Sequence, residues 1–256
     1  MWPKEHGAYG QLLVPAATAL VIAGLSAGAA FVAVSAVAAF LAHEPAAVLI
    51  GSRGPRARRE RGREAWTWLA VCAVLGAAAL AGGLATMSPA AWPYLACPAV
   101  PAAIVALLTT RRREKTWYGE VAAAASLTLV SVPIAMASGA TLQAARSVAI
   151  PFLAMFTTTT FAVRAIIARV RGGGDANMAA AARRAAIAAT TVFAAALALA
   201  TTIGMMALTT LAAAAPGLVA AAILIHRPPP AAKLRTVGWT LVATSLTTSA
   251  LVVIGA

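Results

Sequence analysis

The sequence is short of acidic residues and of charge altogether. It contains seven Asp and Glu against 20 Lys and Arg, and 11% of its residues are charged while 61% are hydrophobic. An average soluble domain has about 25% charged and about 45–50% apolar residues. Disordered chains combine low hydrophobicity with high charge density. The composition excludes both classes and indicates a polytopic membrane protein.

Cysteine is scarce as well. Cys72 and Cys97 are the only two, each inside an apolar run, so neither a disulfide framework nor a cysteine zinc site is expected. The net charge of +13 would suggest nucleic acid in a soluble protein. In a membrane protein it indicates basic loops that set orientation, and we expect no nucleic-acid partner.

The apolar runs predict an all-α bundle of nine transmembrane helices in one membrane domain, residues 1–256. A helix needs about 20 residues to cross about 30 Å of hydrocarbon. The predicted spans are residues 8–26, 30–50, 65–85, 91–109, 119–138, 147–169, 185–203, 205–225 and 236–256.

The basic residues support nine helices. With this number, the clusters at 53–63, 111–115, 169–184 and 227–235 all fall on one side of the membrane. The positive-inside rule makes that side cytoplasmic. We therefore expect the N-terminus in the cytoplasm and the C-terminus outside.

Ionisable residues inside predicted spans mark candidate sites, because charges are costly in hydrocarbon. His43 and Glu44 lie one to two turns before the end of their span if the helix continues through Pro45, whereas a break there would leave free carbonyls beside them. Arg164 shares a helix face with Thr157, and that face must point into the bundle. The alternatives are a solvated end at His43 and Glu44, and an Arg164 that reaches the interface.

A buried Glu44 needs a basic partner, and Arg164 is the partner that we expect. His43, Glu44 and Arg164 are predicted to face one cavity near the cytoplasmic end. On the residues alone, Lys4, Glu5 and His6 are typical of an interfacial anchor at the start of the first span. The family resemblance described below implies that they lie close to the cavity. The arginines at 53–63 suit either a phosphate clamp or contact with anionic lipid.

Three segments resemble the bacterial YwiC-like membrane proteins: residues 3–10 (PKEHGAYG), the His43-Glu44-Pro45 segment with its Gly/Arg-rich continuation, and residues 235–239 (RTVGW). The resemblance covers most of the chain. It implies a bacterial cell membrane as the location.

More distantly, the chain resembles the UbiA-type intramembrane prenyltransferases. These have nine helices, a cytoplasmic N-terminus and two Asp-rich motifs that hold magnesium on a prenyl diphosphate. His43 and Glu44 stand where the first motif would be, and Arg164, Arg169 and Asp175 where the second would be. Glu44 and Asp175 are the only metal ligands that this likeness implies, and Mg²⁺ prefers several hard oxygen ligands.

The UbiA likeness implies catalytic roles for His43, Glu44 and Arg164. The substrate-binding residues that it implies are Lys4, Glu5, His6, Arg53, Arg56, Lys115, Tyr118 and Arg169. Loss of the Asp motifs leaves two alternatives. Either the chemistry is lost or changed, or Arg and Lys replace magnesium as the phosphate clamp.

We therefore predict a UbiA-like membrane protein with a cytoplasm-facing cavity for an isoprenoid or another anionic lipid. Its partners would be membrane lipids such as a prenyl diphosphate or a polyprenyl phosphate. Three functions remain open: a divergent prenyltransferase, a non-catalytic lipid-binding protein, and a transporter with His43 and Glu44 as titrating groups. Mg²⁺ is the one cofactor that the first of these implies.

Overall fold

The structure is a computed structural model that describes residues 6–171, 176–230 and 234–256. These residues form helices joined by turns, and no β-strand occurs among them. The predicted all-α class is confirmed. Contacts divide the chain into two compact units, Met1–Ala145 and Arg146–Ala256, which we call unit 1 and unit 2.

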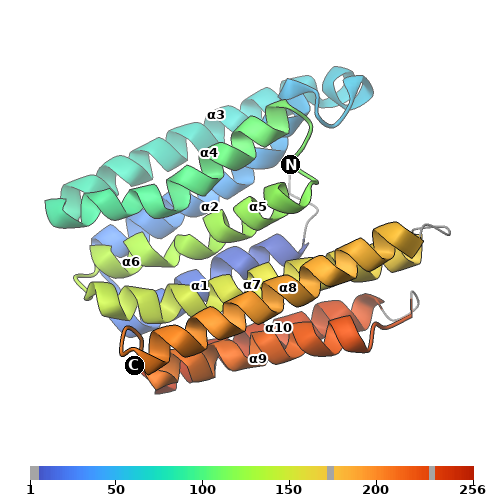
Figure 1. Ribbon diagram of the computed structural model, residues 1–256. Helices are drawn as coiled ribbons and strands as arrows, with labels where there is room; N and C mark the ends of the chain where they lie inside the picture. The colour runs from blue at the N-terminus through green and yellow to red at the C-terminus, as the bar shows by residue number, and fades with distance from the viewer. Residues whose placement is uncertain (1–5, 172–175, 231–233) are drawn as a thin grey trace. The chain divides into compact units, whose positions relative to one another are not determined.

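Unit 1 is a helical bundle in which α2 and α3, and likewise α4 and α5, run antiparallel (Figure 1). α2 packs along α3, α4 packs along α5, and α1 packs against both α5 and α6. Its elements are α1 (His6–Ala23), α2 (Ala27–Ile50), α3 (Pro55–Thr86), the 3-10 helix η1 (Pro89–Leu95), α4 (Ala96–Thr110), α5 (Trp117–Leu129) and α6 (Ser131–Ala137).

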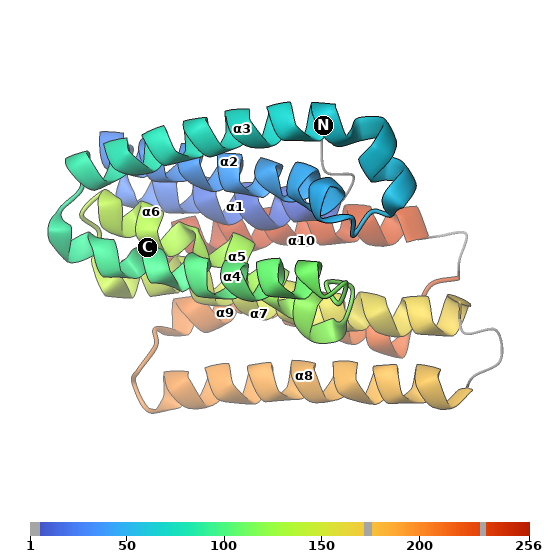
Figure 2. The ribbon, with the colours of Figure 1, turned by 90° about the horizontal axis from the view of Figure 1, so that it is seen from above.

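The described residues of unit 2 form four long helices, the first of which begins just before the boundary at Arg146 (Figure 2). They are α7 (Leu142–Arg171), α8 (Ala176–Thr202), α9 (Leu208–His226) and α10 (Leu234–Ile254). α9 contacts α8 and α10. One buried cluster joins all four helices, with Ile166 of α7, Ala186 of α8, Leu224 of α9 and Val237 of α10.

Eight helical segments in the described chain are long and apolar enough to cross a membrane. η1 and α4 together form one of these segments, and α5 and α6 together form another. Counted in this way, each of the nine predicted spans overlaps either one of the eight segments or α1. The apolar part of α1, Gly7–Ala23, falls short of the length of the other eight. The chain is therefore a multi-pass membrane protein.

Prolines lie inside five of the described α-helices without ending them. These are Pro15, Pro45, Pro101, Pro151 and Pro216. Proline removes one helical hydrogen bond, which a membrane helix tolerates when its neighbours pack around it. α2 accordingly continues through Pro45 to Ile50, and ends at Gly51 with a φ of 84°. The break at Pro45 that the sequence allowed does not occur.

Met155 is the point at which three helices of unit 2 meet. The Thr248 hydroxyl of α10 donates a hydrogen bond to its sulfur at 3.7 Å. Gly217 of α9 lies so close that a Cβ there would stand 2.9 Å from the Cα of Met155. Small residues allow this approach, as is typical of helix packing in membranes.

The turn between α2 and α3 and the loop between α4 and α5 lie at the same end of unit 1 (Figure 1). A side-chain contact between Arg53 and Glu114 joins them. Arg56 is in the first turn of α3 and Arg112 follows the end of α4. The prediction that these two basic segments lie together is therefore confirmed within unit 1.

Candidate functional site

Glu44 lies inside the last turns of α2. It precedes Ile50 by six residues, which corresponds to about 9 Å along a helix at 1.5 Å per residue. Its side chain is 15% exposed, and the adjacent Pro45 is buried. His43 is half-buried. The carboxylate of Glu44 therefore lies below the end of the helix and is largely withdrawn from water.

Arg53 is the basic partner of Glu44. Its Nη2 lies 2.7 Å from Oε2, and its Nε lies 3.1 Å from Oε2 and 3.3 Å from Oε1. Two donors of one guanidinium thus engage the carboxylate, a geometry that gives strong charge-assisted hydrogen bonds. The turn at Gly51 and Gly54, both with positive φ, brings Arg53 back toward the end of α2.

Glu114 is the second carboxylate on the same guanidinium. Its Oε1 accepts a hydrogen bond from Nη1 of Arg53 at 2.8 Å. Its side chain is 13% exposed, and its Oε2 is buried without a hydrogen-bond partner. The loop approaches the start of α5 so closely that a Cβ at Gly119 would lie 2.9 Å from the carbonyl carbon of Glu114. Glycine at 119 therefore lets the loop place Glu114 here.

The three side chains form a cluster in which two acids share one base. Arg53 is 25% exposed, so all three groups are largely withdrawn from water. The neighbouring pair of Arg56 and Glu60 differs, since its side chains are 88% and 57% exposed. Exposed pairs contribute little to stability, whereas a withdrawn pair that loses one partner leaves an uncompensated charge. We therefore expect this cluster to contribute more to the stability of unit 1 than the exposed pair of Arg56 and Glu60.

The predicted magnesium ligands do not form a metal site in the described residues. Both oxygens of Glu44 accept hydrogen bonds from Arg53, and Asp175 lies outside the described residues. No group of three His, Cys, Asp or Glu side chains able to hold a metal occurs in the described chain. Mg²⁺ requires several oxygen ligands, so the donor set does not fit it.

Several predicted substrate-binding residues lie at the same end of unit 1. The Tyr118 ring is half-buried and stands edge-on to Trp117, with ring centroids 5.5 Å apart. Lys115 is exposed. Lys4, Glu5 and the side chain of His6 lie outside the described residues. Their predicted roles remain predictions.

Unit 2 contains a cleft of about 160 Å³ between α7, α8 and α9. Most of its walls are apolar, and two arginines, Arg169 and Arg183, line it. The lining residues are Ala165, Ile166, Arg169, Ala179, Ala180, Arg183, Leu224, Ile225 and Pro228. Its volume is below the ~300–1,000 Å³ of pockets that enclose a drug-sized ligand.

The two arginines reach the cleft by the same local geometry. Arg169 follows Ala165 by four residues on α7, and Arg183 follows Ala179 by four residues on α8. Residues four apart lie on one face of a helix. Small side chains one turn away therefore leave room beside each guanidinium.

The charge of these arginines is not balanced by unit 2. Neither Arg169 nor Arg183 has an acidic partner among the described residues. Residues 146–256 contain nine Lys and Arg but a single acid, Asp175. The described part of unit 2 therefore offers an anion two guanidinium groups beside an apolar wall.

Arg164 is half-buried on α7, five residues before Arg169. It belongs to unit 2, whereas His43 and Glu44 belong to unit 1. The predicted pairing of Arg164 with Glu44 and the common cavity remain predictions. The need of Glu44 for a basic partner is met within unit 1 by Arg53.

Glu114 and Arg183 were not singled out from the sequence. Glu114 stands within Arg-Arg-Arg-Glu-Lys, where a lone acid is typical of a solvated loop. The sequence contains one sign of its role. Glu114 is the only acid in the loop between the fourth and fifth predicted spans. Arg183 had a clearer signal, since Ala179 and Arg183 repeat the spacing of Ala165 and Arg169.

The comparisons with known proteins give one match. The sequence model of a protein family described as YwiC-like protein matches residues 2–135, which is just over half of the chain. No curated protein and no solved structure matches the chain.

Proposed function

We propose that this chain, which belongs to the YwiC-like protein family, binds an anionic lipid whose headgroup is held by Arg169 and Arg183. The observation that carries the proposal is the cleft of unit 2, in which two arginines without acidic partners stand beside apolar walls. Arginine binds phosphate through two parallel hydrogen bonds. An apolar wall beside it suits the first part of a lipid chain.

The size of the cleft favours a headgroup rather than a whole lipid. At about 160 Å³ it holds a phosphate and its nearest carbons, and the remaining chain would lie along the membrane-exposed helices. Phosphorylated isoprenoids, including prenyl diphosphates and polyprenyl phosphates, fit this description. Inside the cell we assign the cleft to the cytoplasmic side of a bacterial membrane, following the positive-inside rule.

The finer part of the proposal is a UbiA-like fold with a divergent prenyltransferase activity. Its support is the sequence resemblance and the positions of the nine predicted spans. The activity would have to proceed without the two Asp clusters, with arginines stabilising the diphosphate charge. Arg53 contributes little to such a clamp, because its guanidinium already engages Glu44 and Glu114.

The first experiment measures lipid binding by the purified full chain in detergent. A polyprenyl phosphate and the matching uncharged polyprenol are titrated, and bound lipid is counted by native mass spectrometry. We expect the phosphate to bind more tightly, and Arg169→Gln/Arg183→Gln to weaken it about tenfold, which corresponds to about 1.4 kcal/mol.

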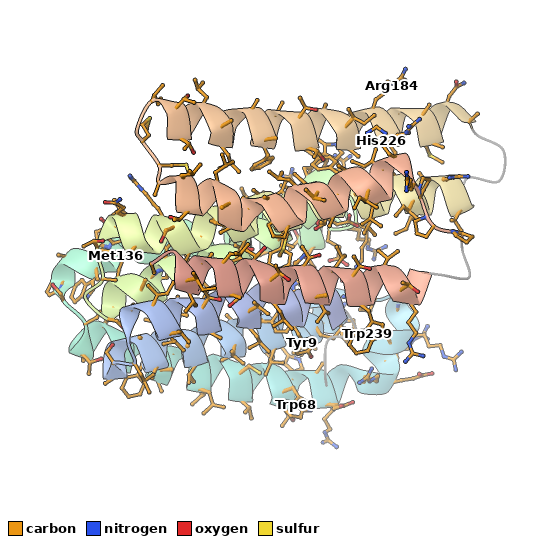
Figure 3. All side chains as sticks on the ribbon, turned by 90° about the horizontal axis from the view of Figure 1, so that it is seen from below. Tyr9, Trp68, Met136, Arg184, His226 and Trp239 are labelled. Atoms are coloured by element: carbon orange, nitrogen blue, oxygen red, sulfur yellow. The ribbon has the colours of Figure 1, made fainter. Side chains whose placement is uncertain are left out.

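The control is Arg184→Gln, because Arg184 is the chain neighbour of Arg183 and points away from the other helices of unit 2 (Figure 3). It removes one positive charge from the same helix without touching the cleft, so it is compared with the single variant Arg183→Gln as well, and we expect a change below about twofold. Equal binding of phosphate and polyprenol would overturn the proposal. If the control variant weakened binding of the polyprenyl phosphate as much as the cleft variant does, binding would depend on overall charge and not on the cleft.

The second experiment separates binding from catalysis. The chain is incubated with a prenyl diphosphate in membranes, and prenylated lipid products are identified by mass spectrometry. Product that requires Arg169 and Arg183 would establish an enzyme. Binding without product would establish a lipid-binding protein.

One observation favours proton-linked transport as a second candidate function. Glu44 and Glu114 share a single arginine, and one oxygen of Glu114 is buried without a partner. Carboxylates in such surroundings are typical of proton pathways. Proton entry into valinomycin-treated proteoliposomes, followed with an enclosed pH dye and abolished by Glu44→Gln, would replace the lipid proposal.

A further inference from the structure

Unit 1 has six arginines that no described acid neutralises. We call them the basic rim: Arg58, Arg59, Arg63, Arg111, Arg112 and Arg113. All six are exposed, and none has an ion pair among the described residues. Four of the five acids in the described part of unit 1 are already engaged by Arg53, Arg56 or Arg61. The rim therefore has an excess of positive charge.

The two halves of the rim lie at the same end of unit 1 although they are far apart in the sequence. The first half lies in the first turns of α3, and the second follows the end of α4. The contact of 2.8 Å between Arg53 and Glu114 joins the segments that carry them. Figure 2 shows both at one end of unit 1, where α3 begins and α4 ends. Both halves therefore belong to one end of unit 1.

An exposed tryptophan follows each half of the rim. Trp66 comes three residues after Arg63 and is 65% exposed. Trp117 comes four residues after Arg113 and is 55% exposed. Each stands where an apolar segment follows the basic one. Tryptophan favours the headgroup level of a bilayer, with its ring toward the hydrocarbon.

We propose that the basic rim docks on anionic phospholipid headgroups in the leaflet that surrounds this end of unit 1. Four to eight basic residues directly beside a membrane span are typical of surfaces that bind acidic lipids. The tryptophans set the depth of the helices, and this depth places the arginines at the phosphates. The six arginines would also attract a nucleic acid. The two tryptophans favour a lipid surface, because tryptophan is enriched at the membrane interface. This surface shares no residue with the cleft of unit 2.

The test compares phosphatidylglycerol with phosphatidylcholine. The full chain with Arg169→Gln/Arg183→Gln is used in every arm, so the cleft contributes to none of them. Each lipid is titrated into the detergent-purified protein, and adducts are counted by native mass spectrometry at low and high ammonium acetate. We expect phosphatidylglycerol to be preferred at low salt and the preference to shrink at high salt.

Two variants of the rim are matched with one control. Arg58→Gln/Arg59→Gln/Arg63→Gln and Arg111→Gln/Arg112→Gln/Arg113→Gln should each lower the preference for phosphatidylglycerol about fivefold or more. Arg61→Gln/Glu64→Gln changes the same helix without changing its net charge, because it removes an ion pair. We expect it to leave the preference unchanged.

Several results would overturn the proposal. One is an equal uptake of both lipids, and another is a rim variant that keeps the preference. Competition by millimolar inorganic phosphate would show a site for free anions in place of a lipid surface. None of these results bears on the cleft, because its arginines are already replaced in every arm.

Discussion

The carboxylates of Glu44 and Glu114 meet on one guanidinium, with Arg53 at 2.7 Å from the first and 2.8 Å from the second. Glu44 belongs to α2 and Glu114 to the loop between α4 and α5. Arg53 therefore joins two helical hairpins at the end of unit 1 where the basic residues gather. Its own charge cannot balance both acids.

Loss of the first carboxylate should destabilise unit 1. Glu44→Gln keeps the size of the side chain but replaces charge-assisted hydrogen bonds from Arg53 with weaker ones to a neutral amide, and we expect a loss of about 1–2 kcal/mol. Cys72 is buried in α3 and Cys97 is half-buried, so the rate at which a thiol-reactive dye labels the heated protein in a Cys97→Ser background reports unfolding. The melting temperature should fall by several degrees.

Glu60→Gln is the matched control for that measurement. It removes a carboxylate from an ion pair with Arg56 on the same end of unit 1, but both side chains are largely exposed. Exposed pairs contribute about 0–1 kcal/mol. An equal effect of the two variants would show that the cluster of Glu44, Arg53 and Glu114 has no special role in stability.

The second carboxylate should be easier to replace. Glu114→Gln loses the charge that Arg53 Nη1 contacts, but it also removes the cost of a charged oxygen buried without a partner. These effects oppose each other. We expect the melting temperature to fall by less than in Glu44→Gln, or to rise. A larger fall would mean that the Oε2 of Glu114 has a partner in the membrane.

Gly217 should not tolerate even a methyl group. In Gly217→Ala the new Cβ would overlap the side chain of Met155 and stand 2.9 Å from its Cα. Overpacking of this kind typically costs about 1–3 kcal/mol. Loss of helical circular dichroism on heating would measure it.

Gly238→Ala provides the opposite case in α10. Nothing lies within 4 Å of a Cβ at that position. Alanine is more favourable than glycine inside a helix by up to about 1 kcal/mol, so we expect the same stability or a small gain. If Gly238→Ala destabilised as much as Gly217→Ala, close packing at Met155 would not be the cause.

The orientation of unit 1 can be measured with single cysteines. In a background without Cys72 and Cys97, Arg58→Cys marks the end with the basic residues and Ser88→Cys marks the turn after α3. Both positions are exposed. A membrane-impermeant maleimide should label Ser88→Cys in intact cells and Arg58→Cys only after lysis. The reverse pattern would place the N-terminus outside.

The positions of the helices could be predicted because their signal is the length of uncharged apolar sequence. The predicted span at 30–50 and the observed α2, Ala27–Ile50, end at the same residue. Prolines did not mark the ends of the helices. A membrane helix that loses one hydrogen bond at a proline would lose more of them by unfolding in lipid, so it continues. Pro45 is the example.

The sequence predicts that Glu44 has a basic partner, but it does not identify which residue that is. A basic partner for Glu44 follows from the cost of a buried charge, but the choice between Arg53 and Arg164 depends on how the chain turns after Ile50. That turn is made by two glycines with positive φ, Gly51 and Gly54. The charge pattern alone does not contain this information. It likewise gives no sign that Glu114 would reach the same arginine.

We expect the proline inside α2 to divide the helix into two parts with unequal protection against hydrogen exchange. Pro45 has no amide hydrogen, so the carbonyl of Leu41 receives no bond from it, and the turns from Ala46 to Ile50 can open without disturbing the rest. The contact between Glu44 and Arg53 bridges this short segment from end to end. This contact holds the two ends of the segment together. Breaking it should speed deuterium uptake in the last turns of α2, while the amides before Glu44 should stay protected.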